Sequence, residues 1–311
     1  METVLITGGA GFIGSNLAIE LVNRGYNVKI FDNLMTGKIS NIKQLLKNII
    51  FIKGDIRNLN LLKDAINDVD CIIHEAAQPS LAKSLADPVL TNEINIDGTL
   101  NVLLAAKNSK VKRVVYASSA AVYGDIAKLP IVETAELEPI SPYAVTKLAA
   151  EYYCLVFNRV FDLETVCLRY FNVFGPNQDT KSEYATVIPK FINVMLKNQS
   201  PTIFGDGKQT RDFIYVKNVV EASVLAMKKK KAVGEIFNIA SGIKTNLNEL
   251  VEKINEILDK TIEPIYTNPR RGDIEHSVAD IKKAEKLLDY KVKYSLEKGL
   301  RDTTEFFKKQ I

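Results

Sequence analysis

The chain has 311 residues, 46% of them hydrophobic, which is enough to bury the core of one large domain or of two lobes. Its 41 basic and 37 acidic residues leave a formal charge of +4, too balanced to indicate a nucleic-acid partner. The sequence shows no signal peptide and no apolar stretch long enough to cross a bilayer, so we expect a cytoplasmic protein without a membrane partner.

The first predicted unit is a strand, a glycine turn and a helix. An apolar run at residues 4–6 leads into glycines at Gly8, Gly11 and Gly14, and residues 15–22 have helical spacing. Glycines at this spacing let a backbone approach a pyrophosphate, and the next helix points its N-terminal amides and positive dipole end at the phosphate charge. Glycine turns also serve ordinary strand-to-helix connections, so the pattern needs supporting context.

That context is a carboxylate at the end of the second predicted strand. The apolar run at residues 28–31 ends in Asp32, 18 residues after Gly14. A carboxylate about 20 residues beyond the glycines accepts the ribose 2′-hydroxyl of NAD and repels the 2′-phosphate of NADP. The sequence therefore predicts an NAD site, with a β-α-β unit that binds no ligand as the alternative.

Strands and helices alternate through the rest of the first half. Strands are predicted near 49–52, 71–74 and 113–117, with helical spacing at 59–66 and 92–107. This alternation predicts an α/β fold built on a doubly wound, Rossmann-type parallel sheet, which binds ligands at the carboxyl ends of its strands. Four positions fall at such ends: Asp32, Asp55, Ala76 and the pair Ser118-Ser119.

A tyrosine and a lysine follow at the start of the next predicted helix, which runs to Phe157. Tyr143 and Lys147 are four residues apart, so they share one helix face. The pKa of a phenol is about 10, so a tyrosine base near neutral pH needs its pKa lowered by about 3, or about 4 kcal/mol. A neighbouring ammonium and the positive nicotinamide ring together supply such stabilisation. Tyr-x-x-x-Lys alone is a common accident, but after a glycine motif and Ser119 it is specific.

The glycine turn, Asp32, Asp55, Ser119, Tyr143 and Lys147 occur together in one family. The chain resembles the extended short-chain dehydrogenase/reductases, and within them the NAD-dependent nucleotide-sugar epimerases of the UDP-galactose 4-epimerase type. Later segments extend the resemblance through most of the chain: Asn95, residues 168–176, residues 205–207 with 211–216, and residues 269–273.

The resemblance implies roles for individual residues. Ser119, Tyr143 and Lys147 would be catalytic, and no residue would bind a metal. NAD would contact Gly8, Gly11, Phe12, Ile13, Gly14, Asp32, Asn33, Asp55, Ile56, Ala76, Ala77, Asn95, Tyr143 and Lys147. The UDP-sugar would contact Ser80, Ser119, Tyr143, Asn172, Val187, Arg211, Arg270, Asp273 and Ser277.

Some of the residues expected to bind the substrate also have a purely structural explanation. Arg211 and Arg270, each expected in a turn beside Gly and Asp, would hold phosphate, but arginines more often form surface ion pairs. Val187, placed at the uracil, also fits an ordinary helix start. Ser277 is placed at the gate of the sugar pocket, where a small side chain leaves room for N-acetylhexosamines. It also suits the start of the helix that ends at residue 288.

The implied chemistry is 4-epimerisation of a UDP-hexose, UDP-glucose or UDP-galactose, through a 4-keto sugar. Tyr143 would take the proton of the 4′-hydroxyl while the hydride moves to NAD, with Ser119 on the same oxygen and Lys147 on the nicotinamide ribose. Related dehydratases and decarboxylases carry acidic residues where this chain has Ala120 and Ala121, so neither reaction is expected. The alternatives are another nucleotide sugar, such as UDP-glucuronate, and a catalytically silent NAD-binding sensor or scaffold.

The second half predicts a smaller α/β substrate lobe. We expect an NAD-binding domain at 1–174 with return segments around 212–242, and a mainly sugar-nucleotide lobe at 175–311. A strand is predicted at 237–240, and helices at 247–258, 282–288 and 296–309. The resemblance implies a homodimer formed through the helices near 95–107 and 143–157. The three scattered cysteines predict reduced core residues.

Overall fold

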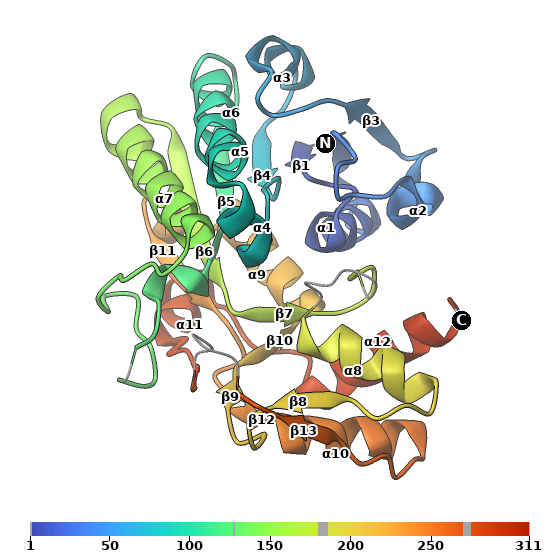
Figure 1. Cartoon of the computed structure of the whole chain (residues 1–311). Helices are drawn as coiled ribbons and strands as arrows, with labels where there is room; N and C mark the ends of the chain where they lie inside the picture. Colours follow the sequence, from blue (N-terminus) through green and yellow to red (C-terminus); the bar gives the residue numbers. More distant parts are fainter. Residues whose placement is uncertain (1, 127, 180–185, 270–274, 311) are drawn as a thin grey trace.

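A seven-stranded parallel sheet organises the molecule (Figure 1). The computed structural model describes residues 2–126, 128–179, 186–269 and 275–310. The strand order is β11-β6-β5-β4-β1-β2-β3, and every neighbouring pair is parallel. The strands are β1 (Thr3–Thr7), β2 (Asn27–Asp32), β3 (Ile49–Lys53), β4 (Cys71–His74), β5 (Arg113–Ser119), β6 (Glu164–Tyr170) and β11 (Ile236–Ile239). The doubly wound α/β fold predicted from the sequence is confirmed.

Side chains alternate between the two faces of this sheet, as the two-residue period of a strand requires. On β1, Val4 and Ile6 belong to one buried cluster and Leu5 to another. The first cluster includes α1 (Phe12–Asn23) and α9 (Val216–Lys228), which pack together. The second lies under α3 (Leu59–Ala65), α6 (Gly98–Lys107) and α7 (Pro142–Phe161). Burial on both faces explains why these strands read as continuous apolar runs.

The glycine turn after β1 is too tight for side chains. Gly8 has φ +70°, a left-handed conformation that favours glycine, and a Cβ there would lie 2.7 Å from the Ala76 nitrogen. A Cβ on Gly14 would lie 2.3 Å from the Gly8 carbonyl oxygen. The turn, the first turn of α1 and the loop after β4 therefore share one crowded backbone junction.

Two predicted helices have different bounds in the structure. The helix expected at 92–107 begins earlier, as α5 (Pro88–Asn92) capped by Asp87, and passes through a π-helical turn at Glu93–Asp97 before α6. Helix α7 continues beyond residue 157 and stops at Asp162, which is left-handed with φ 55°. Two short helices, α2 (Ile39–Ile42) and α4 (Leu81–Ala86), were not predicted.

The second half adds a smaller lobe below the sheet domain (Figure 1). It holds three two-stranded pairs: β7 (Asn172–Phe174) with β10 (Phe213–Tyr215), β8 (Thr202–Phe204) with β13 (Ile265–Thr267), and β9 (Thr210–Arg211) with β12 (Thr245–Asn246). Its helices are α8 (Val187–Leu196), α10 (Leu247–Leu258) and α12 (Leu296–Lys308), whereas α11 (Lys282–Leu288) packs against β11 and α9. The chain returns to the main sheet through α9 and β11 before it completes this lobe.

All three cysteines are buried free thiols. None of the helices in the described part of the chain combines the length and the hydropathy that a bilayer crossing requires.

Candidate active site

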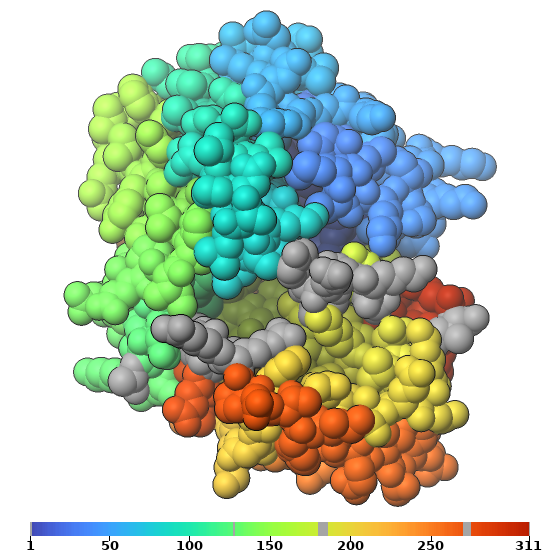
Figure 2. Space-filling view, in the orientation of Figure 1, coloured from blue at the N-terminus to red at the C-terminus, as the bar shows by residue number. Residues whose placement is uncertain are grey.

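A long groove runs across the carboxyl ends of the central strands. Its cavity volume, about 530 Å³, lies within the roughly 300–1,000 Å³ of common small-molecule pockets. Figure 2 shows the surface hollowed between the blue and cyan elements and the yellow lobe. The predicted cofactor residues that line the groove are Gly8, Gly11, Phe12, Ile13, Gly14, Asp32, Asn33, Asp55, Ile56, Ala76 and Ala77.

Asp32, at the end of β2, fixes the glycine turn from the side. Its Oδ2 accepts a hydrogen bond from the Ala10 N–H (2.9 Å), and its Oδ1 accepts one from the Leu34 N–H (2.7 Å). Burial raises the pKa of this carboxyl, while the two backbone donors act in the opposite direction. Each carboxylate oxygen keeps a second lone pair. Asp32 therefore orders the turn and still has acceptor capacity toward the groove.

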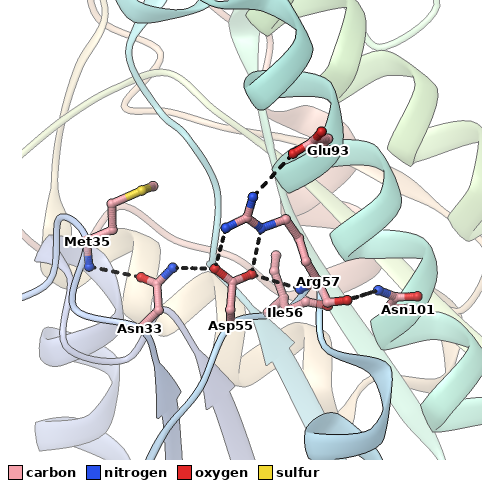
Figure 3. Close-up of polar contacts among 7 residues, drawn as sticks. All are labelled: Asn33, Met35, Asp55, Ile56, Arg57, Glu93 and Asn101. Carbon is pink, nitrogen blue, oxygen red and sulfur yellow. Dashed lines mark hydrogen bonds and ion pairs between the residues drawn. The ribbon is translucent and has the colours of Figure 1, made fainter.

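Asp55, at the end of β3, belongs to a charged cluster (Figure 3). The Arg57 fork donates to both its oxygens, at 3.0 and 2.9 Å, and Asn33 Nδ2 donates to Oδ2 at 2.9 Å. The Arg57 hydrogen bonds lower the pKa of Asp55 to about 2, so the carboxylate stays charged at neutral pH. Arg57 also donates to Glu93 at 3.2 Å. The sequence analysis missed Arg57, although an arginine two residues after a strand-end aspartate was a usable signal.

Asn95 lies in the π-helical turn and is absent from the groove lining. Its Oδ1 accepts from the Gln78 N–H (2.7 Å), and its Nδ2 donates to the Gln78 carbonyl oxygen (3.2 Å) and to Thr146 Oγ1 (2.9 Å). These bonds tie the loop after β4 to α7. Because that loop carries Ala76 and Ala77, Asn95 positions the groove wall from behind.

The three predicted catalytic residues come together where β5 meets α7. Ser119 ends β5, and Tyr143 and Lys147 lie in the first two turns of α7, which begins after the Ser141 cap. The buried Lys147 Nζ donates to the Ala117 carbonyl oxygen at 2.7 Å and lies 6.0 Å from the centroid of the Tyr143 ring. Burial lowers the pKa of Lys147 to about 8.

The expected lowering of the Tyr143 pKa does not come from the protein's own groups. Burial raises the pKa of Tyr143, the Ser119 hydrogen bond opposes that rise, and the negative charge of Glu75 adds to it. Lys147 directs its ammonium at a backbone carbonyl rather than at the phenol. Lys147 is not among the groups that shift this pKa in the protein alone, and the positive nicotinamide ring of bound NAD would lower it.

A buried carboxyl group at this end of the groove was also missed. Glu75 follows β4, lines the groove, and accepts a hydrogen bond from Tyr170 Oη at 2.9 Å. Burial raises the pKa of Glu75 to about 7, while Tyr170 and Lys147 act against that rise. A charged residue directly after the apolar run at 71–74 was the sequence signal for it.

A second cavity, of about 950 Å³ including open solvent, lies in the smaller lobe. Asn172, Val187 and Arg211 line it, and Thr186 lines both cavities, so the two adjoin. The other lining residues are mainly apolar, among them Phe174, Ile188, Phe191, Phe204, Phe213 and Leu247. Val187 is the first residue of α8, so the alternative that it starts a helix is correct as well.

Arg211 lies in the short strand β9, not in a turn, which corrects the sequence expectation. Its Nη1 donates to the carbonyl oxygens of Thr210 (2.9 Å) and Glu275 (3.3 Å). The next residue, Asp212, is fully buried and accepts hydrogen bonds from the Ser241, Gly242 and Ala279 amides. This carboxylate holds β9 in place beside residues 275–279.

Two further residues expected at the substrate, Ser80 and Ser277, have structural contacts of their own. Ser80 lines the first groove and caps α4, accepting from the Lys83 N–H at 3.2 Å. Ser277 donates its N–H to the Thr210 carbonyl oxygen at 3.1 Å, so it lies beside β9. It does not start a helix, because α11 begins at Lys282, and that alternative is wrong. Arg270 and Asp273 lie outside the described residues.

The NAD dependent epimerase/dehydratase family matches residues 4–240. A putative UDP-glucose 4-epimerase of Methanocaldococcus jannaschii is 42% identical over 308 residues, covering 98% of each chain. A UDP-N-acetylglucosamine 4-epimerase structure from Methanobrevibacter ruminantium, in complex with UDP-N-acetylmuramic acid, is 40% identical with a TM-score of 0.96, covering 100% of this chain and 99% of that one. A Bacillus cereus UDP-glucuronic acid 4-epimerase structure with UDP-glucuronic acid and NAD is 33% identical with a TM-score of 0.91, covering 99% and 100%.

Proposed function

Since the chain belongs to the NAD-dependent epimerase/dehydratase family and is an NAD-dependent nucleotide-sugar 4-epimerase, we propose that its substrates are UDP-glucose and UDP-galactose, with room for their N-acetylated forms. The observation that carries the proposal is the site where β5 meets α7. Ser119 is hydrogen-bonded to Tyr143 there, and Lys147 Nζ lies 6.0 Å from the centroid of the Tyr143 ring. Ala120 and Ala121, which follow Ser119, offer no acid for elimination or decarboxylation.

The residues of the groove fit NAD. A Cβ at Gly8 or Gly14 would collide with backbone, so the turn stays narrow. Phe12, Ile13 and Gly14, the first residues of α1, line the groove, so the N-terminal amides of this helix suit a pyrophosphate. Asp32 has acceptor capacity for ribose hydroxyls and would repel a 2′-phosphate. When bound, NAD supplies reversible hydride transfer at the sugar C4′.

The chain's own residues handle the proton and the orientation of the sugar. Tyr143 takes the proton of the 4′-hydroxyl, and Ser119, its hydrogen-bond partner, holds the same oxygen. Lys147 stays fixed through the Ala117 carbonyl, with its ammonium 6.0 Å from the centroid of the Tyr143 ring. Because burial disfavours every anion in the site, we expect proton removal to depend on the positive charge of the bound nicotinamide ring.

The second cavity suits a nucleoside diphosphate. Its apolar and aromatic lining offers contact area to a planar base, and the Arg211 guanidinium suits the geometry of a phosphate. Thr186 marks where the cavity meets the NAD groove, so a sugar nucleotide held there extends toward Tyr143. Binding through the UDP end leaves the sugar free to turn and present its opposite face.

We expect both UDP-galactose and UDP-N-acetylgalactosamine to be converted to their 4-epimers without net formation of NADH. NMR analysis of the products, with and without added NAD⁺, measures this, and UDP-glucuronate serves as the third substrate. The small side chain of Ser277, beside β9, is the reason for expecting both. Turnover of UDP-galactose but not of the N-acetylated sugar would contradict the assignment of Ser277.

A Ser277→Tyr variant sharpens this test. Filling the gate should lower kcat/KM for the N-acetylated substrate by roughly 10–100-fold, while the rate with UDP-galactose stays within about threefold. Equal losses for both sugars would place Ser277 outside the sugar pocket. Preferred turnover of UDP-glucuronate in the wild type would move the substrate proposal to that sugar.

We also propose that the chain forms a homodimer through α7. The outward face of this helix carries exposed apolar side chains at helical spacing: Val145, Tyr152, Val156 and Val160. Contiguous apolar surface of this kind marks an interaction site, and a straight helix stripe suits an isologous contact with the same helix of a second copy.

A Val156→Glu variant is expected to shift the protein from dimer to monomer in light scattering coupled to size-exclusion chromatography, because it places two carboxylates in one apolar contact. Ile243→Glu is the matched control, since Ile243 is also exposed but lies away from α7. A wild-type monomer, or an unaffected dimer in Val156→Glu, would contradict the proposed interface.

A further inference from the structure

The Glu75 side chain is held by a hydrogen bond from a residue far away in the sequence, which a third element contacts in turn. Its Oε1 accepts from Tyr170 Oη, at the end of β6, at 2.9 Å. The same hydroxyl lies 3.1 Å from Ser223 Oγ on α9. The Ser223 hydroxyl in turn donates to the Val219 carbonyl oxygen within α9. A side chain restrained in this way points a carboxyl group in one direction, into a site that it also lines.

The charges around Glu75 are few. Lys147 of α7 is the cation that acts on it, and Tyr143 of the same helix is a neutral phenol at neutral pH. His74, the preceding residue, carries no charge, because burial lowers its pKa to about 3 and its ring bonds to Thr7 and Thr99. Glu151, behind the site, also acts on Lys147, and Lys83 of α4 lines the same groove. Among these groups, Lys147 is the cation whose charge acts on Glu75.

The direction of the groove places Glu75 at the nicotinamide end. Asp32 follows β2, and the glycine turn follows β1, so the ribose of the adenosine half and the pyrophosphate occupy the β2–β1 side. Glu75 follows β4, and the catalytic serine and tyrosine follow β5, on the other side of the glycine turn. The carboxyl group therefore borders the half of the cofactor whose charge changes during the reaction.

We propose that Glu75 sets the balance between the oxidised and the reduced form of the bound cofactor, by favouring the positively charged nicotinamide. The oxidised ring carries a charge of +1 and the reduced ring is neutral, so a nearby carboxylate stabilises one form and hardly affects the other. Lys147, which the reaction needs, acts in the opposite direction. Glu75 offsets that cation and so favours return of the hydride to the sugar over retention of a reduced cofactor.

The role proposed for Glu75 makes the preference for NAD⁺ over NADH depend on pH. The pKa of Glu75 is about 7 in the protein, so its carboxyl group gains charge as the pH rises through neutrality. Binding of the oxidised form favours the ionised carboxylate and therefore releases protons. Preference for NAD⁺ over NADH should rise from pH 6 to pH 8, whereas Tyr143, Tyr170 and His74 do not change charge in that range. Lys147, with a pKa of about 8, begins to lose its charge at the upper end of the range and acts in the same direction, so the rise centred on pH 7 is the part that belongs to Glu75.

The test measures the relative affinity of the two cofactor forms and needs no sugar. The holoenzyme is equilibrated with mixtures of NAD⁺ and NADH of known ratio, and the oxidised fraction of the bound cofactor is assayed. Glu75→Gln, which keeps the shape and the hydrogen bond from Tyr170, should lower the NAD⁺ preference roughly tenfold at pH 8. It should also remove the rise centred on pH 7 and leave only the change that titration of Lys147 causes near pH 8. Tyr170→Phe keeps the charge and should keep the preference at pH 8.

Asp55→Asn is the matched control, because it removes a groove carboxylate at the opposite end and should weaken both forms alike. A Glu75→Gln protein with the wild-type preference at both pH values would overturn the proposal and leave Glu75 a structural residue. So would a wild-type preference that is constant between pH 6 and pH 8, a result that requires no variant. Since neither measurement uses a sugar nucleotide, failure here is separate from failure of the substrate proposal.

Discussion

Replacing Tyr143 with phenylalanine is expected to lower kcat by about 10²–10⁴-fold while the protein stays folded and keeps its NAD. The change removes the hydroxyl group that takes the substrate proton and retains the ring that packs at the start of α7. Lys147 keeps its hydrogen bond to the Ala117 carbonyl, which does not involve the phenol. The loss should therefore appear in turnover and not in cofactor content.

Product NMR with UDP-galactose measures the rate, and the absorbance of cofactor released on denaturation measures NAD content. Tyr152→Phe is the control, since Tyr152 lies on the same helix with its side chain exposed. A Tyr143→Phe protein that epimerises at the wild-type rate would remove the tyrosine from the mechanism. Unchanged biological activity without turnover would favour the alternative of a silent NAD-binding sensor.

The sheet domain was predictable because its signals are local. Each buried strand is a short apolar run that ends in a polar residue, and the glycines of the first turn are required by contacts within a few residues and with the next loop. Asp32 was predictable in the same way, since its place follows from the length of one β-α-β unit. Local patterns were therefore enough to predict the fold and the part of the groove formed by the glycine turn and Asp32.

The missed features depend on residues that are distant in sequence. Glu75 meets Tyr170 and Ser223 only because β4, β6 and α9 converge in the folded chain. Asn95 reaches the loop at Gln78 because a π-helical turn interrupts its helix, and no local pattern marks that turn. The sign of the Tyr143 pKa shift also depends on burial and on Glu75, neither of which the Tyr-x-x-x-Lys spacing contains.

The second large effect is expected from Arg169, which forms a buried ion pair with Glu151 directly behind the catalytic residues. The Arg169 side chain on β6 is 2% exposed and that of Glu151, two helical turns after Tyr143, is 1% exposed. Arg169 Nε and Nη2 donate to the two carboxylate oxygens at 2.8 and 2.7 Å. Its Nη1 donates to Tyr123 Oη at 2.9 Å, and the Ser118 hydroxyl donates to Glu151. Every strong acceptor in this cluster thus has a donor.

Arg169→Met should destabilise the protein by about 3–5 kcal/mol, because it leaves the Glu151 carboxylate buried without its cation. For a chain of this size that is a fall of roughly 5–15 °C in the Tm of the holoenzyme, measured by thermal unfolding. The double variant Arg169→Met/Glu151→Leu removes both charges and should recover most of the loss, since burying a matched pair costs nearly as much as the pair contributes. The single variant Glu151→Leu completes the cycle. If the loss in the double variant equals the sum of the two single losses, the two side chains act independently, and their bidentate contact does not stabilise the floor of the site.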